Sequence, residues 1–517
     1  MGDGRELLLV IALVLAAGLV RLPLLWQVPV FTDEGDEALV ALRIIRDGAR
    51  PLTNDDAYIG PLFNYLLAAV FGLAGPSPWS PRLVTWALGT VTVLSTYLLA
   101  RECVPRVWGV RAARTCGTLA AMLVIVNPVH VVVNSHIAWS GCTTPLFTTL
   151  GAWLVMRGVR DGIMSWRALT LAGLCLGVAL QSHPVALGPV VGLGLFVLTR
   201  HPGVLRLPGT YLAVVAFLVP LLPLMVHNAQ TGGLASVAAA QLSQSRYNRG
   251  EQFAPQLYPE WLWRLLFAFG AELVGLIDDR VNQLPWFAPA AAGAGLILLG
   301  AAIAFVALRG LILPAFVLVT TLLLLPLFHG QFLPLANNGR YVAPLIPVSA
   351  AAVSAAVLWV GRTFPSPVPV RVAASLMATI AIISTVSLVA HLQGSVARGQ
   401  TNASLIASLA ALAPQRGPSE PVLVDRALHR DWTLTEGRLG RVLASWLSLE
   451  GTPYEVVDIG PDGRLSGRSG PQGGLLIMAR GNVPLVERFY SLTEISSGAA
   501  IEASEWRGYL VARAVPR

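Results

Sequence analysis

The chain has 517 residues, of which 55% are hydrophobic and 12% are charged, and its mean hydropathy is +0.65. These values exclude an ordinary soluble protein, because too few polar residues remain to cover the surface of so large a molecule. The net charge of +8 does not indicate a nucleic-acid-binding protein, since every basic residue is an arginine and many lie in short gaps between apolar stretches. The composition predicts a multi-pass membrane protein.

Apolar stretches of the length that a membrane-spanning helix needs, about 20 residues, recur as far as His391. We predict about eleven spans. Eight of them cover about 7–26, 82–100, 115–127, 144–156, 286–308, 311–328, 341–360 and 372–391. The other three, which lie between residues 156 and 286, end near 181, 200 and 227. The apolar run before Arg21 is also short enough for a cleaved signal peptide, which stays open as an alternative.

The gaps between the predicted spans alternate between arginine-rich and arginine-poor. The rich gaps cover residues 101–114, 157–167, 200–206 and 362–371. By the positive-inside rule these gaps face the cytoplasm, so the N-terminus is cytoplasmic and the C-terminal tail lies outside a bacterial-type inner membrane. In the long outer loop, Trp261 to Ile277 is apolar but carries two charged residues, which predicts a helix lying at the membrane surface or dipping partway in.

Charged residues return after about Gly394, and this change marks the predicted domain boundary. Residues 1–393 form the predicted transmembrane module, and residues 394–517 form a small extracytoplasmic α/β domain. We predict strands at 422–424, 474–478 and 509–511 and a helix over 437–449 from their apolar patterns.

Acidic residues gather in the first outer loop, residues 27–81: Asp33, Glu34, Asp36, Glu37, Asp47, Asp55 and Asp56. A carboxylate close to the membrane surface and to like charges has a raised pKa, which suits it to act as a general base. A solvated acidic loop is the alternative. Residues 36–48 have the pattern of an amphipathic surface helix, and a second short helix is predicted over 60–73. Two such helices beside an acidic motif would form a cleft for a lipid-borne substrate.

Several motifs in the chain resemble those of the protein mannosyltransferases and aminoarabinose transferases of the GT-C superfamily. They are Thr32-Asp33-Glu34-Gly35, Gly60-Pro61-Leu62-Phe63-Asn64-Tyr65, Pro81-Arg82-Leu83, Asn127-Pro128, Asn134-Ser135-His136-Ile137-Ala138-Trp139 and Asn338-Gly339-Arg340-Tyr341. The similarity covers roughly residues 7–391. It implies an all-α polytopic fold with juxtamembrane helices at the outer face, and it makes residues 27–81 the catalytic loop.

The resemblance implies an enzyme that transfers a sugar, with inversion, from a polyprenyl-phosphate donor to a hydroxyl or amine of a protein, lipid or glycan acceptor. On this basis Asp33 is the base and Glu34 orients it or binds the acceptor. Arg82 and Arg340, with Tyr341, are candidates to bind the donor phosphate, because fixed arginines stabilise charge on a leaving phosphate. Each arginine could instead be an ordinary interfacial anchor.

Five further residues are candidates to line the cleft: Asp36, Tyr58, His136, His183 and Arg246. The two histidines belong to a set near predicted outer helix ends, where they could bind phosphate or a metal or merely cap helices. Arg246 could contact a substrate or belong to a solvated turn. The stretch after Trp139 lacks the acidic residue that relatives often carry, so a divalent metal has weak support and no cofactor is firmly implied.

Two other classes remain as alternatives. A transporter or flippase of a lipid-linked sugar would also be polytopic, but such proteins keep ionisable residues near the middle of the membrane and often contain repeats. A non-catalytic membrane assembly protein would leave the combined motifs unexplained. The sequence therefore favours a glycosyltransferase that works among membrane lipids and binds no nucleic acid.

Overall fold

A computed structural model describes most of the chain. The described residues are 4–27, 32–54, 56–77, 79–135, 138–159, 165–233, 255–277, 285–327, 338–364, 368–412, 421–426, 447–449, 451–467, 474–498 and 509–517. The chain divides into two compact units. Unit 1 contains Met1–Leu24, Arg50–Tyr65 and Arg82–His391, and unit 2 contains Leu25–Ala49, Leu66–Pro81 and Leu392–Arg517.

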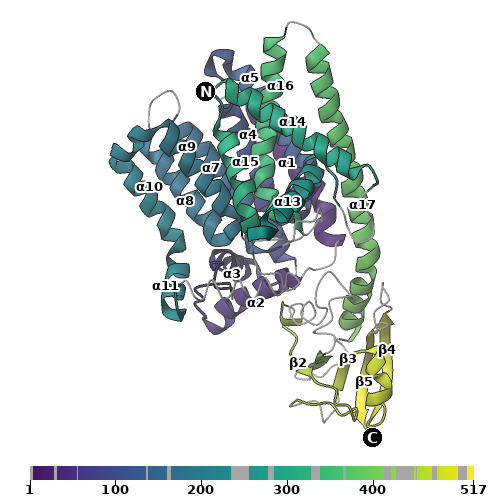
Figure 1. Cartoon of the computed structure of the whole chain (residues 1–517). Helices are drawn as coiled ribbons and strands as arrows, with labels where there is room; N and C mark the ends of the chain where they lie inside the picture. Colours follow the sequence, from purple (N-terminus) through teal and green to yellow (C-terminus); the bar gives the residue numbers. More distant parts are fainter. Residues whose placement is uncertain are drawn as a thin grey trace. The chain divides into compact units, whose positions relative to one another are not determined.

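The described part of the chain is mostly helical (Figure 1). Its α-helices are α1 Gly4–Gln27, α2 Thr32–Asp47, α3 Leu62–Ala74, α4 Ser80–Glu102, α5 Gly109–Val126, α6 Pro128–Val133, α7 Thr144–Gly158, α8 Trp166–Ser182, α9 Leu187–Arg200, α10 Pro208–Leu218, α11 Leu222–Thr231, α13 Tyr258–Leu273, α14 Ala288–Leu308, α15 Leu313–Leu324, α16 Ile346–Thr363, α17 Val368–Leu412 and α20 Val483–Val486. Short 3-10 helices join several of them, and Figure 1 shows α7, α8 and α10 side by side.

Seven helical stretches among the described residues are long and apolar enough to cross a membrane: Gly4–Leu25, Ser80–Glu102, Arg106–Val126, Pro208–Thr231, Ala288–Leu308, Ala343–Thr363 and Arg371–Gly394. The chain is therefore a multi-pass membrane protein. Four other predicted spans correspond to α7, α8, α9 and α15, which have 12 to 17 residues and are shorter than the usual span.

The helix ends and the polar residues inside the bundle have local explanations. Asn127 accepts a hydrogen bond from the backbone N–H of His130 (3.0 Å), and Pro128 occupies the first helical position, so this pair begins α6. Buried threonines bond to their own helix. For example, the hydroxyl of Thr149 donates to the carbonyl four residues earlier, so α7 can bury a polar side chain without a partner on another helix.

The acidic motif of the first outer loop differs from the prediction. The amphipathic helix expected from residue 36 begins at Thr32, as helix α2. Asp33 and Glu34 therefore lie in the first turn of a helix rather than in the loop before it. Since the positive end of a helix dipole stabilises negative side chains, acidic residues are favoured at this position.

The C-terminal region contains a five-stranded sheet in the order β2-β1-β3-β5-β4. The strands are β1 Val422–Asp425, β2 Tyr454–Val457, β3 Gly474–Ala479, β4 Tyr490–Gly498 and β5 Tyr509–Pro516. β1 pairs in parallel with β2 and β3, whereas β5 is antiparallel to β3 and β4. The three strands expected from sequence are confirmed and two more are added. The helix expected over 437–449 lies outside the described residues except for 447–449.

The last predicted span, 372–391, corresponds to the membrane-length stretch Arg371–Gly394. Helix α17, which carries it, continues without interruption from Val368 to Leu412. The return of polar residues ends the apolar stretch but does not end the helix, because alanine, leucine and serine after this point can continue it.

Candidate functional site

Three of the acidic residues of α2, near its N-terminal end, are not fully solvated. Glu34 is 3% exposed and Glu37 is 2% exposed, while Asp36 is half-buried. All three take part in hydrogen bonds or electrostatic interactions, as buried carboxylates must if they are to remain charged. The side chain of Asp33 lies outside the described residues, and only its position in the helix is established.

Arg82 is fully buried in the first turn of α4. An arginine that serves only as an interfacial anchor extends its guanidinium into water, which a fully buried side chain cannot do. Its burial therefore favours a specific role over the anchor role. Whether that role is phosphate binding stays a prediction.

A cation and three aromatic rings gather where three segments of unit 1 meet. The guanidinium of Arg340 lies 4.5 Å from the ring centroid of Trp139 and 5.2 Å from that of Tyr341. The ring of His183 contacts Trp139 edge-on at 4.7 Å and Tyr341 at 5.9 Å. The structure thus brings together three predicted site residues, and it adds Trp139. We call these four residues the arginine–aromatic cluster.

The segment that carries Tyr58 is joined to the segment that carries His183. Tyr58 is 8% exposed, and two residues later the backbone N–H of Gly60 donates to the carbonyl of Gln181 (2.6 Å). A Cβ at Gly60 would overlap Oε1 of Gln181, so a larger residue at this position would require the Gln181 side chain to move. The other two candidates for the cleft, His136 and Arg246, lie outside the described residues.

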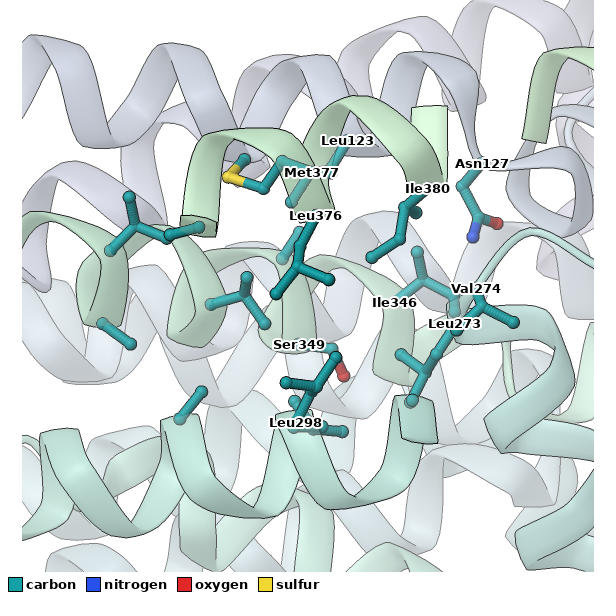
Figure 2. A pocket seen from close by; sticks show the side chains of 18 of the residues that line it. Leu123, Asn127, Leu273, Val274, Leu298, Ile346, Ser349, Leu376, Met377 and Ile380 are labelled. Atoms are coloured by element: carbon teal, nitrogen blue, oxygen red, sulfur yellow. The ribbon is translucent and has the colours of Figure 1, made fainter. Parts of the chain in front are cut away.

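An apolar cavity of about 220 Å³ lies among four of the helices that are long enough to span a membrane. Figure 2 shows side chains from α5, α14, α16 and α17 around it, and Asn127 and Ser349 are its labelled polar residues. Ile346, the first residue of α16, lines the cavity and follows Arg340 by six positions. The turn that carries Arg340 is therefore close in the chain to the cavity wall.

Sequence reasoning missed a buried pair between α1 and α6. Arg21 is fully buried, and its Nη2 lies 2.7 Å from Nδ1 of His130, which is also fully buried. Burial, and then the positive charge of Arg21, hold the pKa of His130 well below its usual value, so the ring is neutral and accepts this hydrogen bond. The signal in the sequence was an arginine inside a spanning stretch, which marks a functional candidate.

Glu272 was noted in the sequence only as a charge on an apolar helix. It is 1% exposed, and burial raises the pKa of its carboxyl well above the usual value. Oε1 lies 3.2 Å from the position that a Cβ would take at Gly339, beside Arg340. Its backbone carbonyl accepts a hydrogen bond from Nδ2 of Asn127 (3.1 Å). It thus joins the cavity lining to the Arg340 turn.

The described residues provide no obvious metal centre. Among them, no group of three or more His, Cys, Asp or Glu side chains is placed to hold a metal ion. Nδ1 of His183 accepts a hydrogen bond from the backbone N–H of Val185 (3.2 Å). This histidine therefore caps a 3-10 turn, which is one of the roles that the sequence left open for it.

These features define a class of protein: a multi-pass membrane protein with a buried polar region beside an apolar cavity and an arginine–aromatic cluster whose Arg340 lies six residues before the cavity wall in the chain. The family model for dolichyl-phosphate-mannose-protein mannosyltransferases matches residues 58–227. A comparison with curated protein sequences finds no match.

Solved structures share the fold along almost the whole chain. The crystal structure of ArnT from Cupriavidus metallidurans bound to undecaprenyl phosphate has 16% identity and a TM-score of 0.57, and the match covers 99% of this chain and 98% of that one. The oligosaccharyltransferase of Archaeoglobus fulgidus in the apo form has 12% identity and a TM-score of 0.50 and covers 99% and 76%. The resemblance to the GT-C superfamily of membrane glycosyltransferases is confirmed, and the chain has its fold.

Proposed function

We propose that this protein is an inverting glycosyltransferase that moves a sugar from a polyprenyl-phosphate donor to a hydroxyl or amine of a protein, lipid or glycan at the outer face of the membrane. The observation that carries the proposal is the arginine–aromatic cluster, because its Arg340 turn leads directly into the wall of an apolar cavity. A carrier lipid needs both features. Its phosphate requires a fixed cation, and its chain requires an apolar surface at membrane depth.

The relatives support this choice of donor. The Cupriavidus structure is a complex with undecaprenyl phosphate, and the matching family model is named for a dolichyl-phosphate-mannose donor. Both are polyprenyl phosphates. The assay described below identifies the sugar, the acceptor and the polyprenol that this protein uses.

In the proposed reaction the acceptor oxygen or nitrogen attacks the anomeric carbon as the bond from that carbon to the phosphate oxygen breaks. Asp33 takes the acceptor proton, and Glu34 orients it or binds the acceptor. Arg340, with Tyr341 and Arg82, stabilises the negative charge on the departing phosphate. Polyprenyl phosphate leaves with the bonding electron pair, and the new glycosidic bond has the opposite anomeric configuration.

The direct test is Asp33→Asn in purified protein, assayed for release of sugar from a panel of undecaprenyl-phosphate sugars in the presence of candidate acceptors. Loss of a general base lowers kcat by about 10²- to 10⁴-fold. Asp47→Asn is the matched control, since Asp47 is an exposed carboxylate at the other end of α2. Equal rates for the folded D33N variant and the parent would exclude Asp33 as the base. A parent that moves the donor across a bilayer without cleaving it would be a flippase.

We also propose a cytoplasmic N-terminus and an extracytoplasmic C-terminal domain, placing the acidic residues of α2 outside. Single cysteines introduced at Asp56 and at Arg160 should label from opposite sides of sealed vesicles. Labelling of both positions from the same side would refute this orientation.

A further inference from the structure

The side chain of Glu272 is a buried carboxyl group, and the described residues place no counter-charge beside it. It is 1% exposed, and neither carboxyl oxygen has a hydrogen-bond partner within the part of the chain that the structure describes. Leaving a buried polar group unpaired costs about 1–3 kcal/mol, and a charged one costs more. A side chain kept at such a cost requires an explanation, which a bound ligand would supply.

The backbone that carries this carboxyl is fixed by its neighbours. Glu272 lies one residue before the end of α13, and its backbone carbonyl accepts hydrogen bonds from Nδ2 of Asn127 and from the backbone N–H of Gly275, both at 3.1 Å. Gly275 has φ of +85°, a conformation that ends the helix at this point. The Cα of Glu272 is therefore held in place by a helix end and by the Asn127 side chain, and a recognition group needs such a fixed base.

The backbone of Glu272 lies beside the apolar cavity, and its carboxyl lies beside the Arg340 turn. Asn127, Leu273 and Val274 line the cavity and are grouped with Ile346 in Figure 2. Oε1 approaches Gly339, where a Cβ would meet Glu272 at 3.2 Å and Val129 at 2.5 Å. A donor whose chain fills the cavity and whose phosphate binds Arg340 would therefore hold its sugar, which lies beyond the phosphate, near the Glu272 carboxyl.

The hydrogen-bonding capacity of the carboxyl indicates which chemical group of such a donor it can bind. A neutral carboxyl offers one O–H donor together with acceptor oxygens, and burial raises the pKa of this group, which favours the neutral form. A sugar hydroxyl both donates and accepts, and so matches it. A phosphate could use only the O–H donor, whereas an ammonium group would require the ionised form.

We infer that Glu272 hydrogen-bonds a hydroxyl of the donor's sugar and is a residue that determines which sugar is transferred. This inference rests on the proposed function. A site built to bond a buried hydroxyl rejects an analogue without it, because the protein group is then left unpaired again.

The test uses the full-length protein in lipid nanodiscs and three probes: the undecaprenyl-phosphate sugar that the parent turns over, its single-deoxy analogues, and sugar-free undecaprenyl phosphate. Glu272→Leu should raise the donor KM roughly tenfold, whereas Glu272→Gln, which keeps a donor and an acceptor, should stay within about threefold. Inhibition by sugar-free undecaprenyl phosphate should be unchanged in both. One deoxy donor should be used equally well by the parent and by E272L. Glu260→Gln is the control, since Glu260 is exposed on α13 and paired with Arg264.

Three results would overturn the inference: weaker inhibition of E272L by sugar-free undecaprenyl phosphate, an E272Q variant as defective as E272L, or equal use of every deoxy donor by the parent. The third result needs no variant, so the inference is testable even if E272L does not fold. An inactive parent would instead refute the proposed function. An active parent whose E272L variant is unchanged would refute only the role of Glu272.

Discussion

Replacing Arg340 tests the site most directly, because its guanidinium is held by geometry that a neutral side chain cannot reproduce. The group lies 4.5 Å from the centroid of Trp139, within the range of a cation–π interaction. For a half-buried arginine that interaction contributes about 1 kcal/mol. A hydrogen bond from a charged donor to the donor lipid's phosphate contributes about 1.5–3 kcal/mol more.

Arg340→Gln removes both contributions. The cation–π contact is present with and without substrate, so only the phosphate bond enters kcat/KM. The expected loss in kcat/KM for an undecaprenyl-phosphate sugar is about 1.5–3 kcal/mol, which corresponds to roughly 10- to 150-fold. Arg340→Lys keeps the charge and loses the planar guanidinium, so about 1 kcal/mol, or roughly fivefold, is expected. The assay is steady-state sugar release, with binding of sugar-free undecaprenyl phosphate measured alongside it.

The matched control is Arg464→Gln. Arg464 lies 4.7 Å from the centroid of Phe489 in unit 2, so it is a second arginine stacked on an aromatic ring, and it is mostly exposed. Indistinguishable kinetics for R340Q and R464Q would refute phosphate binding by Arg340. A lysine variant as weak as R340Q would refute the assignment of most of the energy to charge.

Three further predictions concern the surroundings of the site. Gly60→Ala should lower activity by an overpacking cost of about 1–3 kcal/mol, and adding Gln181→Ala should restore it, because the new Cβ meets the Gln181 side chain. The pKa of His130 is depressed in the folded state, so below about pH 6.5 the unfolded state binds a proton that the folded state does not. The free energy of unfolding therefore decreases as the pH is lowered, by up to about 1.4 kcal/mol per pH unit. His130→Gln should flatten that fall in thermal unfolding scans while still accepting from Arg21. Met377→Trp should fill the cavity and raise KM for long-chain donors about tenfold, with little change for donors with a short chain.

The sequence predicts the helices of this protein well where their signal is local. An apolar stretch such as that of α14 needs no distant partner to be recognised, since its length and composition alone indicate a span. Helix α17 shows the limit of this argument. The apolar pattern locates the part that suits a membrane, but the helix itself continues to Leu412, because backbone propensity and hydrophobicity are separate properties.

The residues of the site were predictable from local motifs, but the contacts between them were not. Arg340 and Tyr341 were predicted within one motif and His183 as a separate candidate, and the structure brings them together with Trp139. The pair between Arg21 and His130 joins residues 109 positions apart. A single sequence contains no information on that pairing, because it arises from helix packing, although the arginine alone was a visible anomaly.

Buried polar atoms without a partner in the described part of the chain include Nε of Arg21, Nε2 of His130 and both carboxyl oxygens of Glu272. These residues are linked in space, since His130 is capped by Asn127 and Asn127 clamps the carbonyl of Glu272. Each unpaired group costs about 1–3 kcal/mol, so the folded protein keeps a continuous polar region at a considerable cost in stability. The groups that are linked through Asn127 lie beside the apolar cavity that Asn127 lines, as expected if a single amphiphilic substrate satisfies them when it binds.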